Sequence, residues 1–381
     1  MSSPDSHSHR GHKAPPRPPL PLEIPIYGPA PALVRAVVEG LSRALPADLR
    51  VGLVADPASA PALSVPLAGT SPEANRIRLY APAWNSDSWR AALADCDLAL
   101  TEGRPKPGHP GVLVLGETNP SSQGNPPVTL VASVPPGTPE VLACVASFAR
   151  PDSLPPGIPV FSPDRVGDLA SLILAYAGSR LAAAPLYGLV LGGGRSARMG
   201  FDKAALAYHG RPQTEYCLDL LRAHCGRVFL SCRADQAEQP GFAGLPQIHD
   251  SFQDLGPMSG ILSALRAHPG AAFLVVACDL PYLDSAALAA LVAGRDPFKI
   301  ATAFRNPESA GKQSGLPEPL CAIYEPRAYA RALQLLGQGL DCPRKLILNS
   351  SCAILPAPAS RSLENANDPE AYRAAVKNLS A

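Results

Sequence analysis

The amino-acid sequence predicts an α/β protein built from two α/β domains. Short apolar runs typical of strands alternate with segments whose apolar residues recur at helical spacing, a pattern typical of mostly parallel sheets covered by helices. Thirty of the 45 prolines fall before Leu186, and the alternation starts again around Ala183–Pro185. The shift in composition and the restart of the pattern indicate two separately built halves within the 381 residues.

The first half is predicted to begin after a disordered tail. Residues 1–23 are polar and rich in proline, so they lack the apolar surface that a packed core needs. The α/β pattern then occupies residues 24–183. Strands are predicted at 24–28, 50–56, 96–103, 111–117 and 128–134, and helices at 31–45, 138–149 and 166–184.

The second half, residues 184–381, repeats the α/β pattern with a different opening. A strand at 186–194 runs directly into a glycine-rich turn. Further strands are predicted at 228–232 and 271–283, and helices at 214–225, 259–268 and 285–294. This half is therefore a second α/β domain.

Composition excludes several classes of protein. Charged residues make up 17% of the chain, and 33 Lys and Arg nearly balance 32 Asp and Glu, so no basic excess favours nucleic acid or an anionic membrane surface. The apolar runs are shorter than the ~18 residues that span a bilayer, and the polar start does not resemble a secretory signal. The nine cysteines form no C-x-x-C pair, which argues against disulfides and structural zinc and predicts a cytoplasmic protein.

The most informative segment is Leu189–Lys203, LVLGGGRSARMGFDK. Glycines after a strand allow backbone N–H groups to approach a ligand closely, and such loops commonly hold phosphate oxygens. Arg195, Arg198 and Lys203 add three cations suited to a polyphosphate. The glycines alone could form a structural turn, and the segment matches neither G-x-x-x-x-G-K-[ST] nor G-x-G-x-x-G. The combination of glycines and cations favours nucleotide binding.

This segment and four later motifs resemble the molybdopterin nucleotidyltransferases, and most of all the molybdenum cofactor guanylyltransferases. The pattern LxGGxSxRMGxDK opens the resemblance, which extends from Tyr187 to the end of the chain. The later motifs are Asp250 in QIHDS, GPMSG at 256–260, CDLPY at 278–282 and NANDPE at 365–370. Segments 317–328 and 342–347 resemble family segments that line the pterin side.

The resemblance implies a fold, a reaction and a set of residues. The fold is a Rossmann-like three-layer nucleotidyltransferase fold with a mostly parallel sheet. The implied enzyme transfers GMP from GTP to the phosphate of molybdopterin with Mg²⁺ and releases pyrophosphate. Molybdoenzyme apoproteins or other cofactor-biosynthesis proteins are its candidate partners. The implied nucleotide-binding residues are Leu191, Gly192, Gly193, Gly194, Lys203, Ser231, Asp250, Gly256, Gly260, Asp279, Asn365 and Asn367.

The residues themselves support this chemistry. Lys203 and Arg198 can offset charge on the phosphates and on departing pyrophosphate. Asp279 ends the apolar run FLVVACD, so its carboxylate should emerge at the carboxyl edge of a sheet, where Mg²⁺ and phosphates collect. Arg198, Lys203 and Asp279 are thus the predicted catalytic residues, with Asp279 on the metal.

Simpler interpretations exist for three of the motifs. Asp279 could cap a helix, although Asp284 and Ser285 stand closer to the next predicted helix. Asp250 could belong to an ordinary turn, and Asn365 and Asn367 could form Asx turns before Pro369.

The nucleotide and the reaction also have alternatives. Relatives that use CTP tend to read LAAG where this chain reads LGGG at 191–194, which favours GTP. The segment Ser231-Cys232-Arg233 departs from the Asn-rich segment expected there and leaves the ribose and base contacts open. The alternatives are cytidylyl transfer to molybdopterin, nucleotidyl transfer to another phosphorylated small molecule, and a non-catalytic nucleotide-binding protein.

The first half more faintly resembles the GTP-binding adapter protein of molybdopterin-guanine dinucleotide biosynthesis. CDLALTEG at 96–103 and the segment from Ile158 to Tyr176 carry the likeness. The phosphate loop is lost, because GPAPALV at 28–34 stands where G-x-x-x-x-G-K-[ST] is expected. The half is therefore predicted to be a degenerate P-loop-like domain without GTPase activity that docks the catalytic half, forms a dimer or helps present the pterin.

Overall fold

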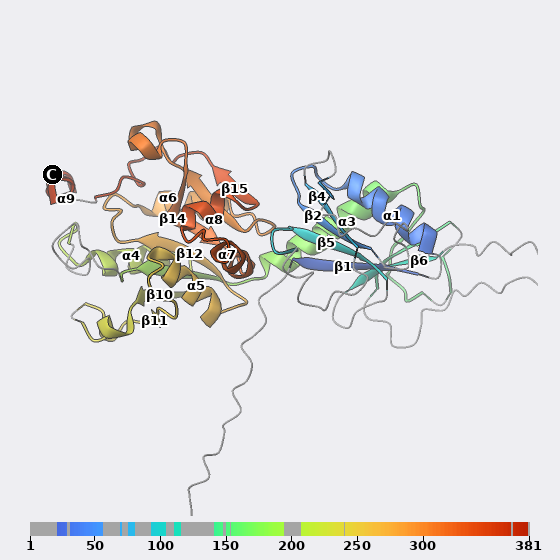
Figure 1. Cartoon of the computed structure of the whole chain (residues 1–381), viewed down its shortest axis with the longest axis horizontal. Helices are drawn as coiled ribbons and strands as arrows, with labels where there is room; N and C mark the ends of the chain where they lie inside the picture. The colour runs from blue at the N-terminus through green and yellow to red at the C-terminus, as the bar shows by residue number, and fades with distance from the viewer. Residues whose placement is uncertain are drawn as a thin grey trace, which may run out of the picture.

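The computed structural model contains two β-sheets that follow one another along the chain (Figure 1). The structure describes residues 21–28, 31–55, 69–70, 75–80, 93–103, 110–115, 141–147, 150–152, 154–193, 207–239, 241–366 and 369–379. We call residues 21–183 the first half and residues 184–379 the second half. Both halves are α/β with mostly parallel strands, which confirms the predicted fold class.

The first half contains an eight-stranded sheet in the order β3-β4-β2-β5-β1-β6-β7-β8. All neighbouring strands are parallel except β3 and β4, which are antiparallel. The strands are β1 (Leu22–Tyr27), β2 (Val51–Ala55), β3 (Gly69–Thr70), β4 (Arg76–Tyr80), β5 (Leu98–Glu102), β6 (Gly111–Leu115), β7 (Val141–Ala146) and β8 (Val160–Phe161). The predicted strand at 128–134 lies outside the described residues.

One helix prediction in the first half is wrong. The segment 138–149 contains strand β7, not a helix, and β7 pairs in parallel with β6. Its run VLACVA is apolar throughout, and Ala143 and Val145 pack in one core while Cys144 and Ala146 pack in another. A strand buried on both faces shows no alternation of apolar and polar residues, so its pattern does not distinguish it from a buried helix.

In the described part of the first half, helices α1 (Pro31–Ala44) and α3 (Val166–Ala182) cover one face of the sheet. The buried stripe of α1 contains Val34, Val37, Val38 and Leu41, at the spacing of one helix face. The stripe packs with α3 residues such as Ile173 in one core, which fixes α3 and with it the chain that leads into the second half.

The second half contains a seven-stranded sheet in the order β11-β10-β9-β12-β14-β13-β15. Strand β14 is antiparallel to its neighbours β12 and β13, and the other pairs are parallel. The strands are β9 (Leu186–Leu191), β10 (Arg227–Cys232), β11 (Gln247–His249), β12 (Ala272–Ala277), β13 (Ala301–Arg305), β14 (Pro317–Tyr324) and β15 (Cys352–Leu355).

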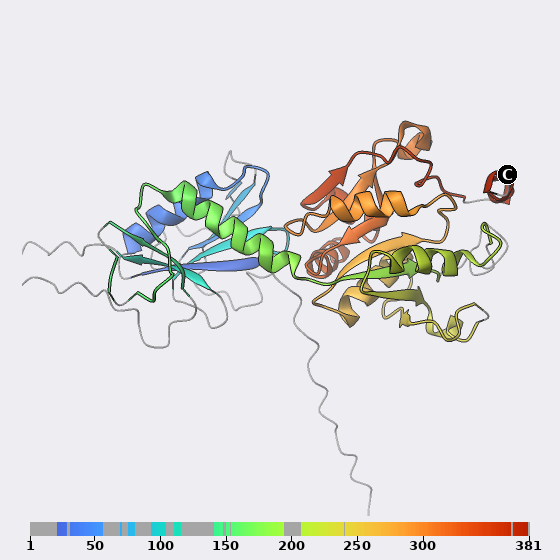
Figure 2. The same ribbon diagram turned by 180° about the vertical axis from the view of Figure 1, so that it is seen from behind.

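Helices lie on both faces of the second sheet, so this half has three layers (Figure 2). One core joins the sheet to α5 (Pro257–Ala267), α7 (Ala328–Leu336) and α8 (Pro343–Leu348). The other joins it to α4 (Gln213–Arg222) and α6 (Ser285–Ala293). The other helices in the described part of this half are α9 (Pro369–Leu379) and the short 3-10 helices η3 (Ala234–Gln236) and η4 (Glu308–Gln313). Within the described residues, no helix combines the length and the apolar character needed to cross a membrane.

The two sheets face each other through their amino edges. Helix α3 runs to the junction, and β9 starts there and leads away from the first half (Figures 1 and 2). Hydrogen bonds join the residues just before β5 to those just before β15, Asp97 to Ser351 among them. The carboxyl edge of the second sheet, where ligands collect in open α/β folds, therefore lies at the end of the molecule away from the first half.

Candidate active site

The glycine-rich turn begins at the carboxyl end of β9, in the middle of the second sheet. The backbone N–H groups of Gly192 and Gly193 both donate to the carbonyl oxygen of Ser231 at the end of β10, at 3.1 and 2.9 Å. These two N–H groups therefore hold the turn against β10.

Close packing explains why glycines stand at these two positions. A Cβ atom on Gly193 would lie 3.0 Å from the Cα of Cys232, and one on Gly192 would lie 2.6 Å from the Cδ1 of Leu230. The first contact is with backbone, which cannot move aside without disturbing β10. The glycines thus let the turn approach the neighbouring strand closely.

Ser231 and Asp250 form a partly buried polar pair beside this turn. The hydroxyl of Ser231, which is 3% exposed, donates to Oδ1 of Asp250 at 3.1 Å. Burial raises the pKa of Asp250, while the hydrogen bond from Ser231 and the charges of Arg233 and His249 act in the opposite direction. The Arg233 guanidinium is paired with Asp235 at 2.9 Å. Asp250 is thus a half-buried acceptor at the end of β11, next to the glycine turn.

Helix α5 starts at the same place. Gly256 precedes it with a φ of 54°, a backbone conformation that favours glycine, and Pro257 is its first residue. One turn in, a Cβ atom on Gly260 would lie 2.3 Å from the Oγ of Ser231 and 2.8 Å from a methyl carbon of Leu191. The first turn of α5 therefore packs directly on the ends of β9 and β10.

This packing makes Gly260→Ala a sharp test of the local architecture. The added methyl group must displace Ser231 and Leu191, so we expect a loss of about 1–3 kcal/mol in unfolding free energy and weaker nucleotide binding. Denaturant unfolding and a nucleotide titration measure the two effects. Gly270→Ala is the matched control, because no atom lies within 4 Å of a Cβ atom there. Equal behaviour of the two variants would contradict the close contact.

Asp279 lies beside this group, two residues after the end of β12. It is 7% exposed, and its carbonyl oxygen accepts a hydrogen bond from the backbone N–H of Ala366 at 2.9 Å. The Sγ of Cys278 donates to the carbonyl oxygen of Leu191 at 3.4 Å. Two predicted regions, the end of β12 and the segment that contains Asn365, are thereby brought to the glycine turn.

The structure also decides which carboxylate caps α6. Asp284 stands before the first helical residue, and its Oδ1 accepts from the backbone N–H of Ala287 at 2.8 Å. The simpler interpretation of Asp279 as the cap of this helix is therefore wrong. Asp279 is left at the carboxyl edge of the sheet.

Sequence reasoning missed Glu318, a second buried carboxylate near Asp279. Val276 of β12 pairs with Cys321 of β14, and Asp279 and Glu318 lie three residues beyond that pair at the same sheet edge. Glu318 is 3% exposed and accepts from the backbone N–H of Leu320 at 2.9 Å. Burial raises its pKa, and the nearby charge of Asp279 adds to that rise.

Two side chains of the second half hold Glu318 in place. The amide of Asn306 donates to its Oε2 at 3.2 Å, and the guanidinium of Arg344 lies 3.6 Å from the same oxygen. Arg344 also donates to the carbonyl oxygen of Pro317 at 3.0 Å. The two segments at 317–328 and 342–347 thus meet beside Asp279. The sequence had singled out these two segments. It did not show that β14 pairs with β12, which is what brings Glu318 beside Asp279.

Several predicted site residues lie outside the described residues. These are Gly194, Arg198, Lys203 and Asn367, together with Arg195. The described part of the site therefore consists of Leu191, Gly192, Gly193, Ser231, Asp250, Gly256, Gly260, Asp279 and Asn365.

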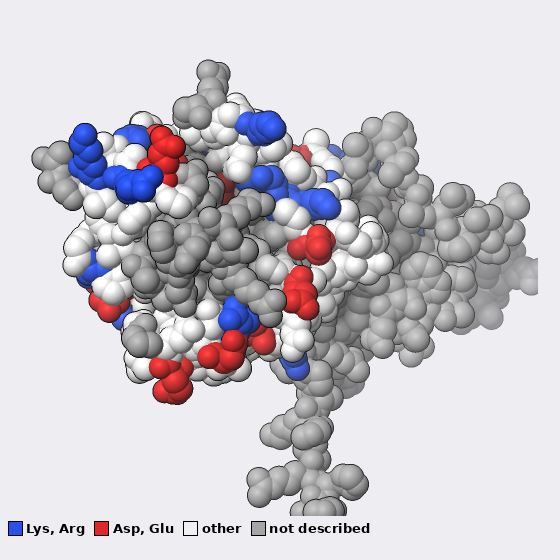
Figure 3. All heavy atoms as spheres, turned by 60° about the vertical axis from the view of Figure 1, so that its left-hand side comes forward, with Lys and Arg blue, Asp and Glu red and all other residues white. Residues whose placement is uncertain are grey.

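The surface at this end of the second half carries charges of both signs. Figure 3 turns this end toward the viewer, and Lys and Arg side chains alternate in small groups with Asp and Glu over the described part of the surface. A protein that binds the phosphate backbone of a nucleic acid presents a continuous basic face. The described surface in this view does not have that form.

The second half matches a known family of domains. Residues 188–351 match the model of the MobA-like NTP transferase domain. A molybdenum cofactor guanylyltransferase of Xanthomonas euvesicatoria is 33% identical over 191 residues, which cover 49% of this chain and 93% of that protein. The matched region is the one that contains the glycine turn and Asp279.

Two further proteins show similarity over the same half. A molybdenum cofactor biosynthesis bifunctional protein of Synechocystis is 40% identical over 188 residues, 49% of this chain, and the match spans 53% of that longer protein. A crystal structure of molybdopterin-guanine dinucleotide biosynthesis protein A from Archaeoglobus fulgidus is 23% identical, with a TM-score of 0.42, over 51% of this chain and 98% of the other.

Proposed function

This chain belongs to the family of molybdenum cofactor guanylyltransferases, and from that premise we propose that its second half transfers GMP from GTP to the phosphate of molybdopterin. The acceptor phosphate attacks the α-phosphorus of GTP and pyrophosphate leaves, so no covalent enzyme intermediate is needed. The observation that carries the proposal is the meeting of the glycine turn, the Ser231–Asp250 pair and Asp279 at one sheet edge.

The nucleotide side of the site is assigned to the carboxyl ends of β9 and β10. Gly192 and Gly193 fix the start of the loop, and the loop cations Arg198 and Lys203 then bind the phosphates and offset the charge of departing pyrophosphate. Asp250, held by Ser231, can accept a hydrogen bond from the ribose or the base. Asn365 is assigned a contact with the nucleotide or the acceptor, because its neighbour Ala366 is hydrogen-bonded through its backbone N–H to Asp279.

The residues present fit a magnesium ion. Asp279 supplies a carboxylate at the ligand-binding edge, the donor type that Mg²⁺ prefers. Mg²⁺ commonly takes most of its ligands from phosphates and water, so one protein carboxylate can be sufficient. Among the described residues, no group of three or more His, Cys, Asp or Glu side chains is arranged to hold a metal. Bound there, Mg²⁺ would neutralise charge on the triphosphate.

Nucleotide titration tests the proposal directly. Full-length protein is titrated with GTP, CTP, ATP and UTP in Mg²⁺, and the titration is repeated with Lys203→Ala. We expect preferential GTP binding that weakens by about 10–100-fold in the variant, because a charge-assisted contact to the phosphates is lost. Preference for CTP would replace guanylyl by cytidylyl transfer. Absence of any nucleotide binding would overturn the enzyme assignment.

We propose that the first half has no GTPase activity. Strand β1 ends at Tyr27 and α1 begins at Pro31, which is too short a connection for the G-x-x-x-x-G-K-[ST] loop. A Cβ atom on Gly28 would lie 1.8 Å from the carbonyl oxygen of Val114, so the start of this connection packs against backbone. GTP hydrolysis by full-length protein in the absence of molybdopterin, lost on changing residues 28–34, would contradict this.

The setting of the reaction follows from the same proposal. The chain would act in the cytoplasm, where its cysteine thiols stay reduced. Its product would pass to molybdoenzyme apoproteins or to other proteins of cofactor biosynthesis.

A further inference from the structure

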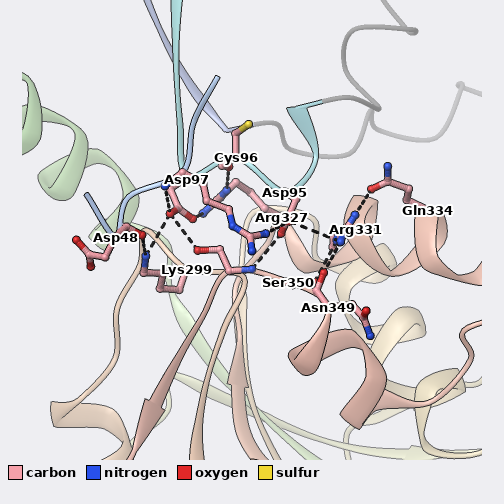
Figure 4. A network of polar contacts seen from close by, with 12 residues as sticks. Asp48, Asp95, Cys96, Asp97, Lys299, Arg327, Arg331, Gln334, Asn349 and Ser350 are labelled. Carbon is pink, nitrogen blue, oxygen red and sulfur yellow. Dashed lines mark hydrogen bonds and ion pairs between the residues drawn. The ribbon is translucent and has the colours of Figure 1, made fainter. Parts of the chain in front are cut away.

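An acidic turn of the first half is buried against the amino edge of the second sheet (Figure 4). Its central residue is Asp97, which immediately precedes β5. The Oδ2 atom of Asp97 accepts from the hydroxyl of Ser351 at 3.0 Å and from the ammonium of Lys299 at 3.2 Å. Its Oδ1 atom lies 3.8 Å from the guanidinium of Arg327. Three side chains of the second half thus converge on one carboxylate of the first.

The same side chains also bind backbone across the junction. Lys299 donates to the carbonyl oxygen of Asp48 at 2.9 Å, and Arg327 donates to that of Cys96. Arg327 donates as well to Phe298 in its own half. Lys299 and Arg327 are therefore oriented by several acceptors at once, which fixes their charges toward Asp97.

Asp95 adds a second carboxylate to the turn. Its Oδ1 accepts from the backbone N–H of Ser351 at 3.0 Å, and its Oδ2 lies 3.6 Å from the guanidinium of Arg331. Arg50 of the first half pairs with Asp95 and also donates its backbone N–H to Asp97 at 2.8 Å. The turn is thus held from both halves and meets a set of donors that matches its two carboxylates.

Burial makes this match selective. Asp97 is 0% exposed, Arg327 3% and Lys299 8%. Burial raises the pKa of Asp97, while Arg327, the Arg50 backbone N–H and Lys299 lower it. A buried charge is costly unless an opposite charge and hydrogen bonds compensate it, and removal of one partner leaves the other uncompensated. A placement of the two halves that buried one of these charges without its partners would therefore be less stable.

We propose that the amino edge of the second sheet is a docking socket for an acidic turn, and that the first half occupies it as a fixed partner oriented by Asp97. The socket consists of Lys299, Arg327, Arg331 and Ser351. It lies at the opposite sheet edge from the glycine turn and Asp279. The first half therefore acts as a docked structural module of this chain.

A cleavable version of the full chain tests the socket. A protease site is inserted between Ala182 and Ala183, which are both exposed, and the folded protein is then cut. We expect the two halves to remain together in gel filtration at micromolar concentration. Asp97→Ala and Lys299→Met should each raise the dissociation constant of the cut halves by at least about 100-fold.

Controls separate loss of docking from loss of folding. Asp168→Ala removes a carboxylate from the first half that pairs with Arg165 on the surface, and it should leave the cut halves together. Circular dichroism of the separated halves checks that each stays folded. The double variant Asp97→Ala/Lys299→Met should weaken docking by less than the product of the two single effects, because Asp97 and Lys299 contact each other directly and their contributions are therefore not additive.

Two results would overturn the proposal. One is separation of the cut but otherwise unchanged halves at micromolar concentration. The other is a dissociation constant that neither Asp97→Ala nor Lys299→Met changes. Lys299→Met changes the second half and leaves the first half unaltered. It therefore still tests the docking if the Asp97 variant of the first half unfolds.

Discussion

Asp279→Asn is expected to lower the rate of nucleotide transfer by at least about 100-fold while the protein stays folded. Asp279 is buried at the end of β12, beside the glycine turn and Glu318. The substitution keeps the size of the side chain and removes its negative charge, which the proposed Mg²⁺ site requires. Loss of a residue that supports a metal ligand typically lowers metal affinity or activity by about 10–100-fold. Loss of the ligand itself should lower activity by at least as much. Steady-state transfer with GTP and molybdopterin measures the effect.

A matched control stands five residues further along the chain. Asp284 caps α6 through the backbone N–H of Ala287, so Asp284→Ala should cost about 1 kcal/mol of stability with little change in turnover. Binding of GTP to the Asp279 variant, measured with and without Mg²⁺, adds a readout that a purely structural role would not alter. If Asp279→Asn turns over at the normal rate, the metal assignment is wrong.

Arg327→Ala is expected to lower the free energy of unfolding by about 3–5 kcal/mol. The side chain is 3% exposed, and it donates to the carbonyl oxygens of Cys96 and Phe298 and lies beside the Asp97 carboxylate. Its removal leaves the buried carbonyl group of Cys96 and the partly buried one of Phe298 without this donor, and Asp97 with one cation fewer. Unfolding in denaturant, followed by circular dichroism, measures the loss.

The control for this prediction is an exposed arginine. Arg165 pairs with Asp168 on the surface of α3, with 61% and 53% of the two side chains exposed. Arg165→Ala should cost no more than about 1 kcal/mol, because water and salt screen such pairs. A loss at Arg327 as small as the loss at Arg165 would show that the junction is not a closely packed part of the fold.

The sequence predicted the parts of the fold that depend on local pattern. Strands β9, β10 and β12 and helices α4, α5 and α6 lie where the apolar spacing places them. Strand β7 was mistaken for a helix, because its residues are apolar on both faces. Strand β14 was not recognised as a strand, since prolines at 317 and 319 are poor strand formers. Without β14, the position of Glu318 beside Asp279 could not be predicted.

Only those residues of the candidate site that belong to sequence motifs could be predicted. The glycine turn, Asp250, Gly260 and Asp279 were chosen from sequence, and the structure brings them to one sheet edge. The junction between the halves was beyond sequence reasoning. Asp97 meets Lys299 at a separation of 202 residues and Ser351 at 254, and neither motif nor periodicity reports such pairs. Their contact depends on how two complete sheets pack.

The two sheets point in opposite directions from the junction, which sets a large distance between their carboxyl edges. Strands β1 and β12 each have six residues, or roughly 20 Å at about 3.3 Å per residue. Since their amino ends meet at the junction, their carboxyl ends are separated by roughly 40 Å or more. A ligand bound at the carboxyl edge of the second sheet would thus lie far from the carboxyl edge of the first.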